Sequence, residues 1–298
     1  MRHLQTFKYV KAIVEAGSIR GAAETLAISP SALNRNIQAL EHDLGISVFD
    51  RLSRGVALSV EGELFYTFAL QQISGFERLA SQIEGVKGLH TGSVAVGVSE
   101  DLNTEFFCKL IADFKNEFPN ISLSIERVRQ EELEDLLVSG SLDFALFYQP
   151  QLSRHIKISY SKQTDVSLLA PNGAQLGIDK SVRLHELENH NVLAPLPHTE
   201  LMIKMESACE RQNIELNSYL ACSDPTPHLL NTYISLLSMS VFPAAEDKSG
   251  VPLGYKRCVL NQSDVGTGYV NIVVERKRHL KLAANKFHER LTAYLDAH

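Results

Sequence analysis

The sequence predicts an α/β protein with a small helical N-terminal domain, a long connecting helix and a two-lobed α/β module. Three observations support this prediction. Apolar residues recur at helical spacing through the first part of the chain. A second amphipathic run then continues for about 30 residues after Ser59. Finally, strand-like and helix-like segments alternate in two successive sets from residue 91 to the end, as they do in α/β lobes.

Composition and charge narrow the class of protein. The chain has 298 residues, of which 44% are hydrophobic and 21% charged, as expected of a globular protein with a large buried core. The formal net charge is −6, yet residues 1–60 hold seven basic and five acidic residues. Because the N-terminal part has the opposite sign from the remainder, we expect it to have a task of its own.

Several classes of site and location are not expected. The four cysteines form no C-x-x-C pair, and the chain contains no phosphate-binding loop, nucleophile elbow or zinc-protease motif, so we predict no metal, no cofactor and no enzymatic activity. The first residues form an amphipathic pattern rather than a signal peptide, and no run of 18 apolar residues exists. A reduced, cytoplasmic protein without a membrane segment is the expectation.

Three helices are predicted in the first sixty residues. The first ends at Gly17, and Ser18 is the expected N-cap of a second helix over 19–26. Ser29 is the expected N-cap of a third helix, with Pro30 at its first position, where the missing N–H costs nothing. Two helices joined by a tight turn are typical of the helix-turn-helix motif.

The third helix has two contrasting faces. Leu33, Ile37, Leu40 and Leu44 repeat at core spacing. The other face carries Ser31, Asn34, Arg35 and Gln38. Asn and Gln pair with adenine and Arg with guanine in the major groove, and a serine near a helix N-terminus binds a phosphate or a base edge. The alternative is an exposed helix with an ordinary polar surface.

A short hairpin follows the third helix. The apolar pieces 48–49 and 56–58 flank a Ser-Arg-Gly turn at 53–55. Arg51 and Arg54 lie in this hairpin, which makes it basic. A basic hairpin beside a recognition helix is a wing, and we expect these arginines to contact the DNA backbone or the minor groove.

The stretch "ISPSALNRNIQALEHDLGISVFDR", together with the flanking "EAGS" and "RGVALS", resembles the DNA-binding domain of LysR-type transcriptional regulators. The resemblance covers residues 1–64 in detail and extends in architecture to essentially the whole chain. It implies that Pro30, Ser31, Asn34 and Arg35 take the base-reading positions and Arg54 the wing position. Asn34 stands where the family more often has serine. It further implies double-stranded operator DNA and a small-molecule effector as partners.

The amphipathic segment after Ser59 predicts the domain organisation. Its apolar residues recur at three- and four-residue steps, and about 30 residues in a helix span about 40 Å. The helix packs either on its own domain or, as the family resemblance implies, against the same helix of a second subunit, within a homodimer that assembles into a tetramer. The expected domains are 1–59 (winged helix-turn-helix), 60–90 (linker helix) and 91–298 (effector-binding).

The last domain is expected to have two lobes. Predicted strands at 93–98, 121–128 and 142–148 alternate with helices and predict a mainly parallel sheet. A second set begins near residue 165, with strands at 166–170, 191–195, 218–222 and 239–243 and helices at 199–213 and 225–236. A strand at 268–276 returns to the first set, before a final helix at 280–295. Lobe I is therefore 91–162 with 267–298, and lobe II is 163–266, as in type 2 periplasmic binding proteins.

The cleft between the lobes is the expected effector site. Ligands of open α/β sheets bind beyond the carboxyl ends of the strands, beside helix N-termini. This rule selects Ser99, Glu100, Asp101, Arg129, Gln130, His198, Thr199, Ser223 and Asp224. Arg129 replaces a residue that is usually small in the family, and we expect it either to bind an anionic group of a small organic anion or to be a solvated arginine.

Two other classes of protein share parts of this pattern. A solute-binding protein fits the two lobes, and an enzyme would use the cleft, but the first lacks an export signal and the second a catalytic constellation. Redox sensing through Cys209 and Cys222 is a minor alternative, because some members of the family join two cysteines in this lobe. The basic run at 275–281 is expected to be a solvated face. The expected effector response is a change in operator binding or bending.

Overall fold

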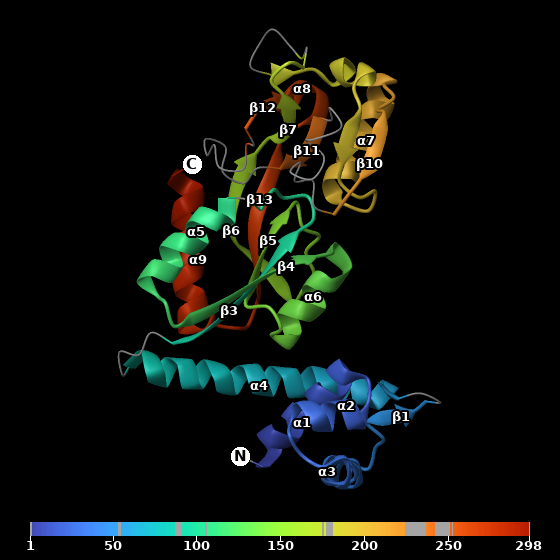
Figure 1. The fold of residues 1–298 in the computed structure, drawn as a ribbon, viewed down its shortest axis with the longest axis vertical. Helices are drawn as coiled ribbons and strands as arrows, with labels where there is room; N and C mark the ends of the chain where they lie inside the picture. Colours follow the sequence, from blue (N-terminus) through green and yellow to red (C-terminus); the bar gives the residue numbers. More distant parts are fainter. Residues whose placement is uncertain are drawn as a thin grey trace. The chain divides into compact units, whose positions relative to one another are not determined.

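The structure is a computed structural model, and it describes residues 2–52, 55–86, 91–104, 106–174, 176, 181–223, 237–241, 251 and 253–297. The chain divides into an N-terminal unit and a larger C-terminal unit, each with its own core (Figure 1). No helix in these ranges is long and apolar enough to cross a membrane.

Three short helices form the core of the N-terminal unit. They are α1 (Arg2–Ala16), α2 (Ile19–Thr25) and α3 (Pro30–Leu44). The predicted caps are present: the Ser18 side chain accepts from the backbone N–H of Gly21, and that of Ser29 accepts from Ala32. Both caps satisfy N–H groups that the first helical turn leaves unpaired. Ala22 and Ala23 are fully buried, which lets the helices approach closely.

A two-stranded antiparallel hairpin follows, β1 (Phe49–Arg51) and β2 (Val56–Leu58), as predicted. The Glu41 carboxylate accepts hydrogen bonds from the backbone N–H groups of Val48 (2.8 Å) and Phe49 (3.2 Å). The last turns of α3 therefore hold the start of the hairpin in place.

The long helix α4 (Val60–Val86) contains 27 residues. Part of one face packs on α1, where the Phe7 ring lies edge-on to Phe65 and Phe68 at centroid distances of 5.8 Å. The same helix also exposes an apolar stripe that is not covered within the N-terminal unit. The stripe consists of Val60, Leu64, Phe68, Phe76 and Leu79.

Lobe I of the C-terminal unit is built on a five-stranded sheet in the order β4-β3-β5-β13-β6. The strands are β3 (Gly92–Ser99), β4 (Ile121–Val128), β5 (Phe144–Tyr148), β6 (Ile156–Thr164) and β13 (Gly268–Glu275). Helices α5 (Phe106–Glu117) and α9 (Leu282–Ala297) cover one face, and α6 (Gln130–Ser139) covers the other (Figure 1).

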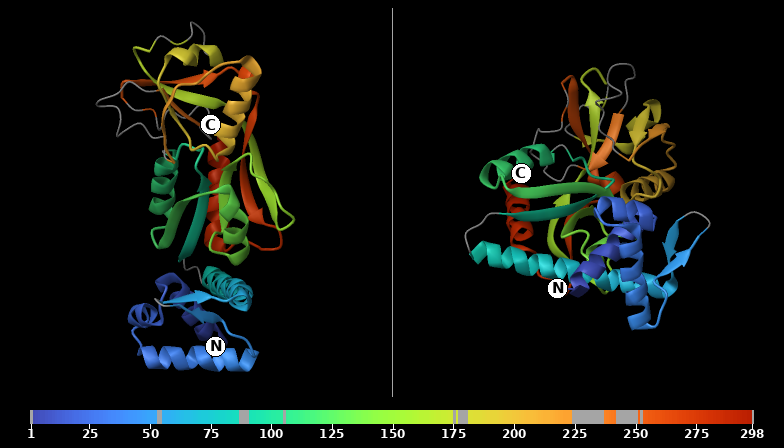
Figure 2. Two further views of the ribbon diagram at one scale, coloured as in Figure 1. Left: turned by 90° about the vertical axis from the view of Figure 1, so that its right-hand side faces the viewer. Right: turned by 60° about the horizontal axis from the view of Figure 1, so that its bottom comes forward.

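Lobe II is built on a six-stranded sheet in the order β10-β9-β11-β7-β12-β8. Its strands are β7 (Val166–Pro171), β8 (Ser181–Val182), β9 (Val192–Ala194), β10 (Ser218–Ala221), β11 (Leu237–Val241) and β12 (Tyr255–Leu260). The described helices of this lobe are η1 (Leu184–Asn189), α7 (Glu200–Gln212) and α8 (Gln262–Val265). Figure 2 shows α7 beside the sheet.

The sheet of lobe I is mainly parallel, as predicted. Strands β4, β3, β5 and β6 run in one direction, and β13 runs antiparallel to its neighbours β5 and β6. The reason is that β13 is the chain returning from lobe II, so it enters the sheet from the opposite end. Strands β6, β8 and β12 were not predicted, and the strand expected at 239–243 begins at Leu237. The helix expected at 225–236 lies outside the described residues.

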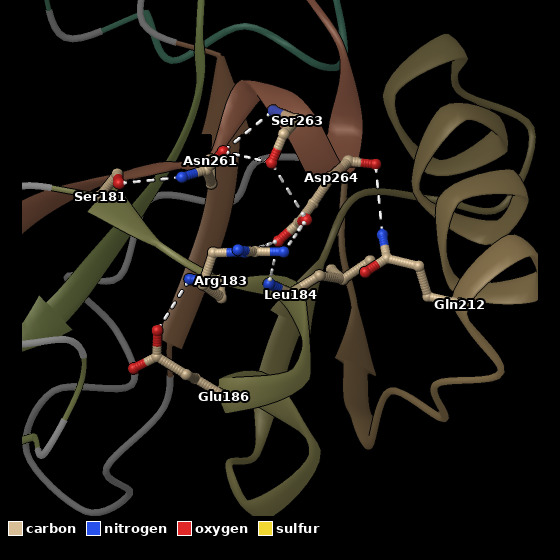
Figure 3. A network of polar contacts seen from close by, with 8 residues as sticks. All are labelled: Ser181, Arg183, Leu184, Glu186, Gln212, Asn261, Ser263 and Asp264. Carbon is tan, nitrogen blue, oxygen red and sulfur yellow. Dashed lines mark hydrogen bonds and ion pairs between the residues drawn. The ribbon is translucent and has the colours of Figure 1, made fainter.

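A network of polar contacts, here called the clasp, surrounds the Asp264 carboxylate in lobe II (Figure 3). Arg183 donates two hydrogen bonds to the Asp264 carboxylate, from Nε at 2.7 Å and from an Nη at 2.8 Å, and the backbone N–H of Leu184 donates a third at 2.9 Å. The Asp264 side chain is only 3% exposed. The clasp joins the start of η1 to α8, two segments far apart in the sequence.

Asp264 makes lobe II sensitive to acid. The Arg183 guanidinium beside Asp264 holds the pKa of that carboxyl below its ordinary value, and the Leu184 N–H acts in the same direction. A carboxyl with a depressed folded pKa stabilises the fold above its unfolded pKa of about 3.9, and this stabilisation is lost as pH falls through the folded value. We therefore expect Asp264→Asn to lower the unfolding free energy at pH 7, by an amount that shrinks below pH 4.

Urea unfolding followed by circular dichroism measures this effect, since the chain has no tryptophan. Asp264→Ala is the harsher companion variant, because it also leaves the buried Leu184 N–H unpaired, at about 1–3 kcal/mol. A loss in Asp264→Asn that is equally large at pH 7 and pH 3 would contradict the assigned ionic role.

Candidate DNA-contacting face and ligand cleft

The two faces of α3 differ as the sequence predicts. Leu33 and Ile37 are buried in the core of the N-terminal unit, beside Val10 and Ile13. On the opposite side, the residues predicted to read bases are exposed or half-buried. They are Pro30, Ser31, Asn34, Arg35 and Gln38, of which only Asn34 is half-buried. Figure 2 shows α3 lying along one side of this unit.

Three side chains of this face have no hydrogen-bond or ion-pair partner among the residues that the structure describes. Within the described part of the chain, the Asn34, Arg35 and Gln38 side chains make no hydrogen bond and no ion pair. Their neighbour Asn36 is different, because its amide donates to the carbonyl of Ala32 at 2.8 Å. An amide, a guanidinium and a second amide are thus presented side by side with their hydrogen-bonding capacity unused, which is what base-edge recognition requires.

The hairpin contacts the turn between α1 and α2 at Gly17. Gly55 has a φ of +86°, and a Cβ there would lie 2.4 Å from the carbonyl oxygen of Gly17, so only glycine fits. The next residue, Val56, donates its N–H to that same oxygen at 3.1 Å. Arg51 is the last residue of β1, but its side chain and the whole of Arg54 fall outside what the structure describes. Their DNA contacts stay predictions.

The cleft residues predicted in lobes I and II converge. Seven of them line one small cavity of about 20 Å³: Ser99, Glu100, Asp101, Arg129, Gln130, His198 and Thr199. The first three follow β3, the next two follow β4, and the last two precede α7. The cavity therefore lies at the carboxyl ends of the lobe I strands and at a helix N-terminus of lobe II, as the strand-end rule predicts.

The lining of the cavity differs from the prediction at several positions. Ser223 is exposed and lies outside the lining of this cavity, and Asp224 lies outside the described residues. The sequence analysis missed Phe147, Tyr148 and Glu200, which also line the cavity. The signal for the first two was available, because they are the carboxyl end of β5, a third strand of the same parallel set.

Polar contacts hold the lobes together across the cleft. The Glu100 carboxylate of lobe I is paired with the His198 ring of lobe II at 2.6 Å. Gln151 donates its side-chain amide to Glu200 at 2.7 Å, and the backbone N–H of Leu201 donates to Asp101 at 3.2 Å. These contacts hold the cleft closed. A ligand that binds the same groups can replace them.

Two buried titratable groups, Asp101 and Tyr148, lie at the base of the cleft. Asp101 is 3% exposed, and burial raises its pKa to about 6, against the opposing effect of hydrogen bonds from Thr199 and Leu201. The Tyr148 hydroxyl is fully buried without a hydrogen-bond partner. Burial raises the pKa of Tyr148 as well, and the negative charges of Asp101, Asp165 and Glu200 add to the effect.

Arg129 does not stand free, as a direct anion site would require. Its guanidinium bonds the Glu132 carboxylate at 2.6 Å on the first turn of α6, and the pair is half-exposed. This contact raises the pKa of Arg129 and lowers the pKa of Glu132. An effector anion would have to compete with Glu132 for the guanidinium.

The arrangement of the possible metal ligands and of the two cysteines in lobe II bears on metal and redox chemistry. No group of three or more His, Cys, Asp or Glu residues there is placed to hold a metal ion. Cys209 and Cys222 are free thiols, and burial raises the pKa of Cys209, which opposes formation of a reactive thiolate.

Known proteins share both parts of this arrangement. Residues 2–63 match the bacterial regulatory helix-turn-helix domain of the lysR family, and residues 87–296 match the LysR substrate binding domain. The HTH-type transcriptional regulators YybE and YtlI of Bacillus subtilis are 25% and 24% identical to this chain. The aligned segments cover 72% and 70% of this chain and 73% and 68% of theirs.

Solved structures agree in fold. Full-length CbnR in complex with its target DNA superposes with a TM-score of 0.64 at 18% identity, covering 98% of this chain and 99% of that one. A full-length OxyR variant from Pseudomonas aeruginosa gives a TM-score of 0.64 at 18% identity, covering 98% of this chain and 97% of the other.

An N-terminal helix-turn-helix joined to a two-lobed α/β module defines a DNA-binding regulator with an effector-binding domain. The chain belongs to the family of LysR-type transcriptional regulators. It is a regulator and not an enzyme.

Proposed function

We propose that this regulator recognises a specific operator through the outward face of α3, with residues Ser31, Asn34, Arg35 and Gln38 at base edges or phosphates. The observation that carries the proposal is the row of three hydrogen-bonding side chains on α3 that have no partner in the described part of the chain. Pro30 begins the helix, and the free N–H groups of the first helical turn can bind a phosphate. The wing arginines Arg51 and Arg54 add backbone or minor-groove contacts.

Titration of a labelled duplex from upstream of the protein's own gene tests this proposal. Fluorescence anisotropy at several salt concentrations should give a steep fall of affinity with salt, because Lys and Arg displace counterions from phosphates. A scrambled duplex should bind more weakly at every salt concentration. Equal affinity for both duplexes, or no binding at low salt, would rule out operator recognition by α3.

The apolar stripe on α4 supports dimerisation. Val60 is 78% exposed and Leu64 74% exposed, and a row of large apolar side chains at helical spacing is unfavourable in water. We propose that residues 60–90 form the linker that pairs two subunits, with 1–59 as DNA-binding domain and 91–298 as effector domain. Two dimers then make a tetramer, which places several recognition helices on one operator.

Leu64→Glu should break this dimer. A charge at the centre of an apolar helix pair is desolvated without a partner, so we expect the dimer to dissociate at micromolar concentrations and operator affinity to fall at least tenfold. Sedimentation velocity measures the mass. Thr67→Glu is the matched control, because Thr67 is an exposed polar residue of the same helix. A Leu64→Glu variant that stays dimeric would place the interface elsewhere.

The cleft is the proposed effector site, lined by Ser99, Glu100, Arg129, Gln130, His198 and Thr199, with Ser223 at its margin. Effector binding would displace cross-lobe contacts such as Glu100–His198 and so change the angle between the lobes. In a dimer or tetramer, this change alters the spacing of the recognition helices, and thereby operator binding or bending. A protein with this task works in the compartment that holds the DNA, the cytoplasm.

The charge of the effector is not settled by Arg129. The sequence suggested a small organic anion because an arginine stands at this strand end. Since Glu132 already occupies the guanidinium, the arginine does not by itself favour an anion.

A further inference from the structure

The cleft has an inner and an outer chamber. The inner chamber is the cavity of about 20 Å³ between Ser99, Tyr148 and Thr199, which has room for little more than a water molecule. The outer chamber has a volume of about 600 Å³, which is the size of a ligand pocket. Both chambers are lined by Gln130, His198 and Glu200, so they adjoin.

Carboxylates dominate the charge of both chambers. The inner chamber is lined by Glu100, Asp101 and Glu200, and the outer chamber adds Glu131 and Glu134. The described lining holds two groups that can be cationic, and both are already engaged. Arg129 is bonded to Glu132, and His198 is bonded to Glu100, each at 2.6 Å. Negative charge is therefore in excess, and an anion entering the cleft would be repelled.

The Tyr148 hydroxyl is an independent sign of a missing ligand group. Tyr148 is one of the residues that line the inner chamber, and its hydroxyl is fully buried without a hydrogen-bond partner among the described residues, which is rare for a buried polar atom. Its oxygen can accept a hydrogen bond. An ammonium group satisfies this acceptor and offsets the charge of the neighbouring carboxylates.

The outer chamber has a surface for the rest of the ligand. Leu152 and Ile203 line it and are 50% and 49% exposed, and the Ile156 side chain lies on its wall. These apolar groups come from the segment before β6 in lobe I and from α7 in lobe II. A hydrocarbon portion placed here would remove apolar surface of both lobes from water, which stabilises the closed cleft.

We propose that the effector is a small organic amine. Its ammonium group enters the inner chamber between Glu100, Asp101 and Glu200 and donates to the Tyr148 hydroxyl, and its apolar part lies against Leu152 and Ile203. The inference rests on the proposed role of the cleft in effector sensing, and it replaces the organic anion by a ligand of the opposite charge.

Hexylamine, hexanoate and hexanol are matched probes of this proposal, since they share an alkyl chain and differ in charge. Isothermal titration of the full-length protein at pH 7.5 should show binding of hexylamine, with hexanoate and hexanol at least tenfold weaker. Glu200→Gln should weaken hexylamine about tenfold, which corresponds to about 1.4 kcal/mol. Tyr148→Phe, which removes only the hydroxyl, should weaken it several-fold.

Glu206→Gln is the matched control, because Glu206 is an exposed glutamate of the same helix α7 that lines neither chamber. Circular dichroism confirms that each variant is folded, and Glu131→Gln provides a second, outer-chamber test. Hexanoate binding that requires Arg129, or hexylamine binding unchanged by Glu200→Gln and Tyr148→Phe, would overturn the proposal. Binding of none of the three probes would overturn it as well.

Operator titration of the same protein separates the two proposals. If the wild-type protein discriminates operator from scrambled duplex but binds hexanoate rather than hexylamine, the regulator function stands and the amine is wrong. If operator discrimination is absent, operator recognition by α3 fails, whatever the cleft binds.

Discussion

Arg35→Ala is expected to remove most of the operator specificity of this protein while leaving it folded. The Arg35 side chain is exposed on α3 and has no partner within the described part of the chain, so its removal leaves no buried group unsatisfied. A bidentate arginine-guanine contact contributes about 1–3 kcal/mol of discrimination, and a dimer makes it twice. Specific affinity should therefore fall by about 30-fold or more, at about 1.4 kcal/mol per tenfold.

The measurement is fluorescence anisotropy on the operator and on a scrambled duplex at one fixed salt concentration. Affinity for the scrambled duplex should change little, because phosphate contacts supply nearly all non-specific binding. Lys11→Ala is the matched control, since it removes a positive charge from α1, where Lys11 pairs with Glu15 at 3.7 Å. An equal loss on both duplexes would make Arg35 a phosphate contact and not a base contact.

Lys281→Met is expected to be the most destabilising of the substitutions considered. The Lys281 Nζ lies 3.4 Å from the Asp143 Oδ1, and the two side chains are 8% and 4% exposed. Asp143 also accepts from the backbone N–H of Ala95 at 2.9 Å, so the pair joins the start of α9 to β3 and β5. Removing one partner of a buried ion pair leaves the other charge buried alone, at a cost of about 3–5 kcal/mol.

The pH dependence of the unfolding free energy tests whether the loss of stability in Lys281→Met comes from the Asp143 charge. Burial raises the pKa of Asp143, and Lys281 opposes the shift. Without Lys281 the folded pKa rises further, so the cost of Lys281→Met should be largest at neutral pH and shrink in acid as Asp143 takes up a proton. Lys281→Met combined with Asp143→Asn should recover part of the lost stability in urea unfolding.

Lys277→Met is the control for this experiment. Lys277 belongs to the same basic run but is exposed, so its substitution should change the unfolding free energy by less than about 0.5 kcal/mol. A similar loss in Lys277→Met and Lys281→Met would mean that the run acts through its overall charge and not through the buried pair.

Much of the N-terminal unit and of the alternating C-terminal pattern follows from local spacing. The caps at Ser18 and Ser29, the buried Leu33 and Ile37, and the free face around Arg35 are set by residues three or four positions apart. The residues after β3 and β4 were also predictable, because parallel strands end at one edge of a sheet. Such features need only the periodicity of an element and the chemistry of its ends.

Contacts between distant segments were decided by the tertiary structure alone. Lys281 looked like part of a solvated basic run, yet it is buried against Asp143, which lies in another element. The sequence left Arg129 open as either an anion site or a solvated arginine, whereas in the structure Glu132 holds its guanidinium. Glu200 from lobe II joins Glu100 and Asp101 of lobe I. The sequence by itself thus determined the class of protein and its DNA-reading helix. The charge of the cleft depends on which side chains meet across the lobes, and the strand directions depend on how the chain returns; local periodicity encodes neither.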